Sequence, residues 1–380
     1  MPPSATVPRV AQVIHSLGAG GAEKVLTDLS RVHHDAGFEM IVIGLSSVED
    51  PLHADQLRAA GVRVYALERG RFDPRAIPLV AGILTAERID LVHTHLKHAD
   101  IVGGVAAWRC GLPQVTTLHL IEEPTDLRGR GKLALASAVR NARAARILAV
   151  SRAQREWYVR DTRVDPGRVE VLPNGVGDPQ PIAPAVAARL RAELDVPPEA
   201  VVGLMVTVMR PGKGHGTLLE AVRRIPRDSP LVIGIAGSGE LEPMIRAEVN
   251  DDPVLRQRVR LLGYRTDVAA LLQAVDFVVH PTEADALPTT LIEAAACTRA
   301  VVASDVGGVP DIVTPDTGIL LPPKDPAALA GALTRLAAEA DTRARLGAAA
   351  RERYEQVFDA GRWAGRLGDL YRSLVSARPA

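Results

Sequence analysis

Short apolar runs, many of them rich in Val and Ile, alternate along the chain with segments whose apolar positions recur at helical spacing. Helical segments such as 22–34 and 130–145 separate most of the runs in the first half. Strands that alternate with helices are typical of parallel sheets covered by helices, so the pattern predicts a doubly wound α/β fold. The strands predicted in the first half are 10–17, 38–45, 62–67, 91–95, 114–119, 146–150 and 169–172.

The alternation breaks at 173–181, where Pro, Gly, Asn and Asp interrupt both helices and strands. It then resumes, and from Pro326 onward the pattern is helical. The strands predicted in the second half are 201–208, 231–236, 259–262, 276–280, 300–304 and 318–321. We therefore predict two Rossmann-like domains and a final helical segment, with an N-terminal domain at 1–175, a linker at 176–184, a C-terminal domain at 185–358 and the helix at 359–380.

The chain has 380 residues, enough for two domains with separate cores. Lys and Arg number 45 together, as do Asp and Glu, so no overall charge attracts nucleic acid and any anion site must be local. Cys110 and Cys297 are too few for a disulfide scaffold, which favours a reduced, cytoplasmic protein. We find neither a signal peptide nor an apolar run of spanning length, so contact with a membrane would be peripheral, at its inner face.

The most informative segment is 281–296, PTEADALPTTLIEAAA, which follows a predicted strand and opens a short helix. Free N–H groups and the positive dipole end at a helix start favour an anionic ligand. Asp285 and Glu293 flank this start, which makes sense if they bind hydroxyls of a ligand whose phosphates lie at the helix. That combination describes a nucleotide sugar. The structural alternative is a capping box formed by Thr290 and Glu293, but Pro288 suits the first helical position and would start the helix too early for it.

Several glycine-rich loops also follow predicted strands, and each is either an ordinary turn or a place where the backbone approaches a ligand. The first, at 17–24, is no dinucleotide fingerprint, because Glu23 stands where a third glycine would fall. The glycines with a proposed binding role are Gly20 and Gly21 in this loop, Gly237 in the loop at 237–240, and Gly307 and Gly308 in the loop at 306–311.

The loop at 207–216 carries Arg210 and Lys213 just before a predicted helix. Cations at a helix start oppose its dipole, so they make sense if a diphosphate binds there; the alternative is that they are solvated loop charges. The loop is not a Walker A motif, because the glycine expected five residues before Lys213 is missing and His215 is not adjacent to that lysine.

Histidines gather at the ends of two predicted strands. His93, His95 and His98 suggest a metal site, but no acidic or cysteine ligand lies at a suitable spacing, so we expect no metal. His119 ends the fifth predicted strand, where a structural role and a ligand-contacting role are both open.

Taken together, these segments resemble the retaining glycosyltransferases of family 4, also called group 1, which have the GT-B fold. The resemblance covers nearly the whole chain and rests on the order and spacing of its motifs. The matching parts are 20–23 (GGAE), His119 after 116–118, 150–151, 171–176 (VLPNGV), 213–215 (KGH), 307–310 (GGVP) and the acidic pair, Asp285 and Glu293.

The resemblance implies a role for each matched residue. In the family two acidic residues enclose seven others, usually with Glu at both ends; here Asp285 takes the first position and would face the donor sugar, while Glu293 would bind the ribose. Lys213 would neutralise the diphosphate leaving group, His119 would lie near the transferred sugar, and Gly20 or Gly21 would approach the donor phosphates. Leu287, Thr289, Thr290 and Gly237 are expected on the donor side, and Gly307 and Gly308 in a substrate loop.

One position departs from the family pattern. An arginine often precedes the lysine by five or six residues, where this chain has Val208 or Thr207. Either Arg210, three residues before Lys213, supplies this positive charge, or the site functions with one positive charge fewer.

The resemblance further implies two Rossmann-like domains that face each other across a cleft and a C-terminal helix that crosses back to the first domain. Trp363, Leu367, Leu370, Tyr371 and Leu374 give that helix an apolar face. The implied reaction is transfer of a sugar from a nucleotide diphosphate sugar, as co-substrate, to a hydroxyl acceptor, which is a glycan, a lipid-linked sugar or a secondary metabolite. The resemblance implies that no metal or cofactor takes part and that a phosphate oxygen of the leaving group acts as the base. The rivals are a nucleotide-sugar epimerase of the same fold, which needs carboxylates that we cannot assign, and a non-catalytic nucleotide-sugar-binding protein.

Overall fold

The structure, a computed structural model, describes residues 7–18, 20–46, 52–70, 73–122, 126–197 and 199–377. The chain divides into two compact units. The N-terminal unit comprises Met1–Gly177 together with Val357–Ala380, and the C-terminal unit comprises Asp178–Gln356.

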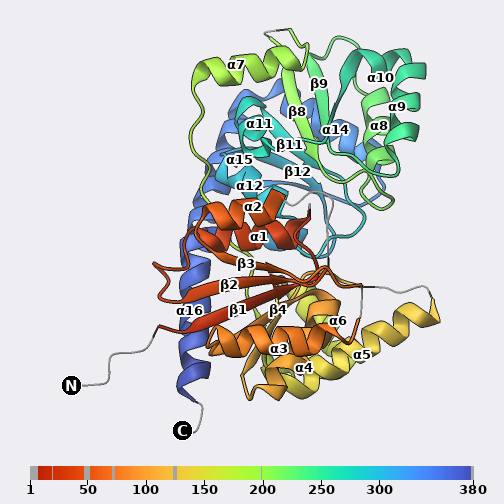
Figure 1. Ribbon diagram of the computed structural model, residues 1–380. Coiled ribbons are helices and arrows are strands. Elements are labelled where there is room, and N and C mark those ends of the chain that lie inside the picture. The colour runs from red at the N-terminus through yellow and green to blue at the C-terminus, as the bar shows by residue number, and fades with distance from the viewer. Residues whose placement is uncertain are drawn as a thin grey trace. The chain divides into compact units, whose positions relative to one another are not determined.

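The N-terminal unit is built on a seven-stranded parallel sheet with the order β3-β2-β1-β4-β5-β6-β7 (Figure 1). Its strands are β1 (Arg9–Ile14), β2 (Glu39–Gly44), β3 (Arg63–Ala66), β4 (Leu91–His95), β5 (Gln114–Leu118), β6 (Ala144–Ala149) and β7 (Val169–Val171). Its helices are α1 (Gly21–Ser30), α2 (Leu52–Ala59), α3 (Ala76–Ala86), α4 (Leu96–Arg109), α5 (Leu127–Arg143), α6 (Arg152–Thr162), the short 3-10 turn η1 (Pro166–Arg168) and α16 (Ala360–Ser376).

Alternate residues of β1 face opposite sides of this sheet, as the period of a strand requires. Val10 and Ile14 join a core that includes residues of α1 and α16, whereas Ala11 and Val13 join a core with α3 and α4. Both faces of the central strand are therefore covered, which explains why β1 is mostly apolar, with Arg9 and Gln12 as the exceptions.

The C-terminal segment completes the N-terminal unit. Val176, where the chain leaves the unit, is hydrogen-bonded to the segment that returns to it. Its carbonyl oxygen accepts from Ala360 N (3.1 Å), and its N–H donates to Phe358 O (2.9 Å). Trp363 and Tyr371 of α16 are then buried in the same core as β1. The apolar face read from the sequence thus packs on the first sheet.

The C-terminal unit has a six-stranded parallel sheet with the order β10-β9-β8-β11-β12-β13. Its strands are β8 (Val201–Val206), β9 (Leu231–Ala236), β10 (Val259–Gly263), β11 (Phe277–His280), β12 (Ala300–Ser304) and β13 (Gly318–Leu321). Its helices are α7 (Pro184–Glu193), α8 (His215–Arg223), α9 (Glu242–Asp251), α10 (Pro253–Arg258), α11 (Val268–Ala274), α12 (Thr289–Ala296), α13 (Val309–Ile312), α14 (Pro326–Ala338) and α15 (Ala340–Arg353), and the π-helical turn η2 (Tyr354–Phe358) leads back to the first unit.

The two parallel sheets confirm the predicted fold class, and each predicted strand is present. The differences lie at element ends. The strand predicted at 10–17 ends at Ile14, because the residues that follow enter the loop before α1, and β6 begins at Ala144, inside the helix predicted at 130–145. Among the described residues, no helix combines the length and the apolar character needed to cross a bilayer.

Candidate functional site

In the C-terminal unit, the predicted donor-side residues lie on loops that follow β8, β9, β11 and β12. β8 and β11 are neighbours in the sheet, but the chain continues from β8 to β9 on one side and from β11 to β12 on the other. Such a switch point is where doubly wound sheets bind their ligands, at the carboxyl ends of the strands.

The loops after β8 and β11 are joined by an ion pair. Lys213 Nζ donates a hydrogen bond to Asp285 Oδ2 at 2.6 Å, and the two side chains are only 11% and 18% exposed. Nε2 of His280, the last residue of β11, lies 3.5 Å from the same oxygen. Two residues that are far apart in the sequence therefore form one charged centre beside a buried histidine.

This surrounding keeps Asp285 ionised. Burial by itself would raise the pKa of the carboxyl group, but the contact with His280 and the positive charge of Lys213 outweigh it and lower the pKa to about 2. His215, at the start of α8, is buried close by; burial, together with the nearby His280 and Lys213, lowers the pKa of its imidazole to about 4. At neutral pH the centre thus contains a carboxylate, an ammonium group and a neutral imidazole.

Glycines bring the loops of this centre together. Gly214 has φ +78°, and a Cβ at this position would collide with the carbonyl of Pro281. Gly307, with φ +52°, lies against the carbonyl of Asp285 in the same way, and that carbonyl accepts a hydrogen bond from Gly308 N at 3.0 Å. The close approach that Gly307 permits is therefore made to the protein backbone, and it fixes the position of Asp285.

Gly237, after β9, also packs on a backbone carbonyl, that of Thr207 at the end of β8. Its φ of +145° is open to glycine but strained for other residues. Arg210 lies further along the β8 loop; its side chain is exposed and forms no ion pair within the described residues. The structure thus brings Lys213 to Asp285 and leaves Arg210 at the surface.

α12 follows the acidic loop directly. The helix begins at Thr289, with Pro288 as its N-cap and without a side-chain capping bond, so the capping box considered for Thr290 and Glu293 does not form. The expectation that Pro288 occupies the first helical position is wrong by one residue, because Pro288 has extended backbone angles (φ −71°, ψ 108°). Leu287 is buried, whereas Thr289, Thr290 and Glu293 are half-buried on the first two turns.

In the N-terminal unit, the predicted residues lie after β1, β4 and β5, around the switch point between β1 and β4. Gly20 is the N-cap of α1 and Gly21 its first residue. Glu23 folds back onto Gly20, and its side chain is buried. Burial raises the pKa of this carboxyl group to about 7, although hydrogen bonds to its own backbone and to Ser16 oppose the shift.

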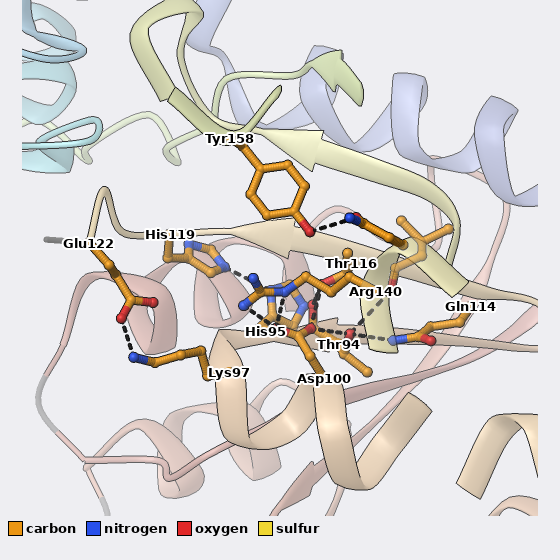
Figure 2. A network of polar contacts seen from close by, with 12 residues as sticks. Thr94, His95, Lys97, Asp100, Gln114, Thr116, His119, Glu122, Arg140 and Tyr158 are labelled. Carbon is orange, nitrogen blue, oxygen red and sulfur yellow. Dashed lines mark hydrogen bonds and ion pairs between the residues drawn. The ribbon is translucent and has the colours of Figure 1, made fainter. Parts of the chain in front are cut away.

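His119 lies directly after β5 and is half-buried. Its Nε2 is 2.9 Å from Nδ1 of His95, which is buried at the end of β4, and Figure 2 shows the two rings joined in this way. Burial lowers the pKa of His119 to about 4. In the part of the chain that the structure describes, no group of His, Cys, Asp and Glu has the arrangement of a metal site.

Figure 2 also draws a second polar network, which joins α4 and α5 to β4 and β5. Asp100 is fully buried and pairs with Arg140, whose Nη2 and Nε each lie 2.8 Å from Oδ2. The hydroxyls of Thr94 and Thr116 donate to the other carboxylate oxygen. Because all these groups are satisfied inside the unit, the network holds the ends of β4 and β5 in place and is itself structural.

A loop connects β5 to α5. Residues 127–130 form the first turn of α5, and the side chain of Asp126 caps it by accepting a hydrogen bond from Gly129 N at 2.7 Å. Residues 123–125 lie outside the described residues. At the other end of the loop, Lys97 pairs with Glu122.

Three residues that contact these centres were missed by reasoning from the sequence. They are His280, Ser16, which hydrogen-bonds Glu23, and Gln12, whose Oε1 lies 2.8 Å from Nε2 of His95. His280 stands directly before the acidic loop, and Gln12 is a polar residue inside an apolar strand. Both positions are signals that can be read in a sequence. Ser16 lies in a loop and carries no such signal.

Comparison with known proteins identifies the family of the chain. Residues 19–178 match the family model described as Glycosyltransferase Family 4, and residues 200–339 match the model described as Glycosyl transferases group 1. The D-inositol 3-phosphate glycosyltransferase of Kineococcus radiotolerans is 30% identical, over 95% of this chain and 92% of its own length. The alpha-maltose-1-phosphate synthase of Mycobacterium tuberculosis is 31% identical, over 77% of this chain and 81% of its own.

Solved structures show the same fold. The Anabaena protein HepE, crystallised with UDP and glucose, superposes with a TM-score of 0.85 at 22% identity, covering 96% of this chain and 100% of that one. Sucrose-phosphate synthase of Thermosynechococcus elongatus gives a TM-score of 0.80 at 24% identity, covering 98% and 100%. The chain is a glycosyltransferase with the GT-B fold, and it belongs to the family 4, group 1 glycosyltransferases.

Proposed function

We propose that this glycosyltransferase moves a sugar from a nucleotide diphosphate sugar to a hydroxyl acceptor with retention of the anomeric configuration. The observation that carries the proposal is the pair of Lys213 and Asp285 at the switch point of the C-terminal sheet. A lysine and an ionised carboxylate at this place suit the two ends of such a donor, its diphosphate and its sugar hydroxyls.

In this proposal the departing diphosphate takes Lys213 as its counter-ion, and Asp285 accepts hydrogen bonds from the donor sugar. The free N–H groups at the start of α12, near Thr289 and Thr290, add positive potential. Stabilising the charge that develops on the leaving group is worth about 2–4 kcal/mol for a single well-placed donor, which makes it the main catalytic contribution here. The exposed Arg210, on the same loop as Lys213, is assigned to the same phosphates.

Glu293 is assigned to the ribose, and Gly237 and Leu287 to the nucleotide side of the donor. Gly20 and Gly21 at the start of α1 are assigned to the donor phosphates, with Gly307 and Gly308 supporting the acidic loop. No metal or cofactor takes part, and a phosphate oxygen of the leaving group acts as the base. The proposed place of work is the cytoplasm or the inner face of the membrane.

The names of curated relatives guide the choice of acceptor. Two of them are named for products or acceptors that carry phosphate, inositol 3-phosphate and maltose 1-phosphate. An acceptor panel should therefore contain phosphorylated polyols and sugar phosphates beside glycans and lipid-linked sugars.

The proposal is tested by incubating the protein with UDP-, GDP- and ADP-sugars, with and without these acceptors, while release of nucleoside diphosphate and the anomeric form of the product are followed by NMR. Slow donor hydrolysis and a product with the donor's configuration are expected, at a rate that EDTA does not change. An inverted product would refute retention. A changed sugar still attached to its nucleotide would indicate an epimerase, and binding without turnover a non-catalytic protein.

Lys213→Ala should abolish most of this activity, and Lys324→Ala provides the control. Lys324 belongs to the same unit, but its side chain is 68% exposed and pairs with Glu283 instead of Asp285. Equal losses in both variants would show that removal of any lysine is harmful and would remove the support for a leaving-group role.

A further inference from the structure

A run of hydrogen bonds inside the N-terminal unit leads from α16 to His119. Nε2 of Gln12 lies 3.3 Å from the hydroxyl of Tyr371, and Oε1 of Gln12 lies 2.8 Å from Nε2 of His95. Nδ1 of His95 then meets Nε2 of His119 at 2.9 Å, the contact drawn in Figure 2. Gln12, His95 and Tyr371 are each at most 1% exposed, so water does not compete for these bonds.

The amide oxygen of Gln12 determines where the protons of this run lie. A carbonyl oxygen can only accept, so Nε2 of His95 is the donor. A neutral imidazole has one N–H, and Nδ1 of His95 must therefore accept from His119. The proton of a neutral His119 is thereby placed on Nε2, and its Nδ1 keeps a lone pair.

Both rings are neutral at physiological pH. Burial lowers the pKa of His119 to about 4 and that of His95 well below its usual range, with the neighbouring histidines adding to the shift for His95. Protonating His95 at Nδ1 would place its N–H against the Nε2–H of His119, which this geometry does not accommodate.

Tyr371 couples the Gln12 amide to a third histidine. Its hydroxyl lies 2.6 Å from Nδ1 of His93, and Nε2 of His93 lies 2.7 Å from the hydroxyl of Thr117. The hydroxyl of Tyr371 accepts from Gln12 and donates to His93, which in turn donates to Thr117. Reversing any one of these bonds requires reversing all of them. In the direction observed, His93, His95 and His119 all carry their proton on Nε2, the more stable tautomer of a free neutral imidazole.

We propose that Gln12 and Tyr371 are positioning residues, which hold His119 in the Nε2–H tautomer so that its bare Nδ1 accepts a hydrogen bond from a hydroxyl of the bound sugar. Nδ1 of His119 has no hydrogen-bond partner among the residues that the structure describes, and His119 is the member of the run that is partly exposed. The sugar hydroxyl as ligand rests on the proposed function, whereas the tautomer does not.

The tautomer can be measured directly by NMR on protein labelled at histidine, because the 13Cδ2 and ring 15N shifts distinguish the two forms. The signals are assigned by the one that disappears in His119→Asn and the one that disappears in His95→Asn. We expect both residues to be Nε2–H in the wild type at pH 7. Finding His119 of the wild type as Nδ1–H, or as a mixture, overturns the proposal.

Tyr371→Phe tests the positioning role, and Tyr158→Phe is the matched control. Both tyrosines are completely buried in the same unit, and each loses one hydroxyl, but that of Tyr158 donates to Asn141 instead of joining the run. In Tyr371→Phe the Gln12 amide loses its acceptor and the two directions of the run become comparable. We expect a mixture of His119 tautomers in that variant and the wild-type form in the control; an unchanged tautomer in Tyr371→Phe refutes the role.

The effect on ligand binding follows from the populations. If half of the molecules present the wrong nitrogen, the apparent affinity for the donor sugar falls about two-fold, because only the competent fraction binds. A donor lacking the hydroxyl that His119 contacts should not respond to Tyr371→Phe. If the tautomers behave as expected while no nucleotide sugar binds at all, the positioning role stands and the proposed function fails, so the two failures can be told apart.

Discussion

Replacing Lys213 by alanine should damage stability and turnover by different amounts and for different reasons. In the folded protein, Lys213 and His280 outweigh burial and lower the pKa of Asp285 from 3.8 to about 2. At about 1.4 kcal/mol per pKa unit, the environment of the carboxylate favours its charged form by roughly 2.5 kcal/mol. Asp285 is 18% exposed and keeps the contact with His280, so we expect Lys213→Ala to cost about 2–3 kcal/mol, less than a fully buried pair would lose.

A loss of this size should lower the melting temperature of the C-terminal unit by about 5–10 °C, given roughly 2–4 °C per kcal/mol for a unit of its length. The expected loss in turnover is larger. Removing a donor to the leaving group costs about 2–4 kcal/mol in the transition state, which corresponds to roughly 30- to 1,000-fold in rate. Donor hydrolysis and differential scanning fluorimetry on the same preparation measure both effects.

The double variant Lys213→Ala with Asp285→Asn separates the two effects. Asparagine carries no charge, so the unpaired buried carboxylate is removed and most of the lost stability should return. The rate should stay low, because the cation opposite the leaving group is still absent. Our reasoning is refuted if the single variant keeps the wild-type rate, if it is as stable as the wild type, or if the double variant regains turnover.

Three further outcomes are expected. Glu293→Gln should weaken binding of a bare nucleoside diphosphate, whereas Asp285→Asn should mainly weaken sugar-bearing donors; calorimetry that shows equal losses with both ligands in both variants contradicts this division. Truncation after Ala360 should speed hydrogen exchange in residues 1–175, because the buried face of α16 is lost, and unchanged exchange there would disprove its part in that core. Burial raises the pKa of Glu23 from 4.5 to about 7 in the folded state. The protonated carboxyl group therefore adds up to about 3 kcal/mol to the free energy of unfolding, and this contribution is complete below pH 4.5 and is lost as the pH rises through 7. Glu23→Gln should therefore be less sensitive to pH than the wild type between 4.5 and 7, as followed by urea denaturation; equal pH dependence would show that Glu23 is not the titrating group.

The sequence was informative where a residue's environment depends on its near neighbours. The strands can be read because parallel strands are buried on both faces and leave long apolar runs. Asp285 and Lys213 stand out because each lies in the loop that follows such a run. Pro288 was misplaced by one residue, since the exact start of a helix depends on the loop that enters it.

Contacts between distant segments could not be predicted in the same way. The ion pair of Lys213 and Asp285 spans 72 residues and arises because β8 and β11 are neighbours in the sheet. Gln12 can be recognised as an unusual polar residue in a strand, but its partner Tyr371 lies 359 residues further along the chain. The network around Asp100 escaped notice for the same reason, because its members come from different helices and strands.

The return of α16 to the first sheet has a consequence for biosynthesis. A ribosome makes residues 1–177 first, yet the core of that unit lacks Trp363 and Tyr371 until the whole intervening unit has been translated. The C-terminal unit, which is continuous in sequence, can close as soon as it emerges, whereas the unit that began the chain is completed last. A nascent chain interrupted before α16 therefore exposes an unfinished apolar face on its oldest part, where chaperones and proteases can recognise it.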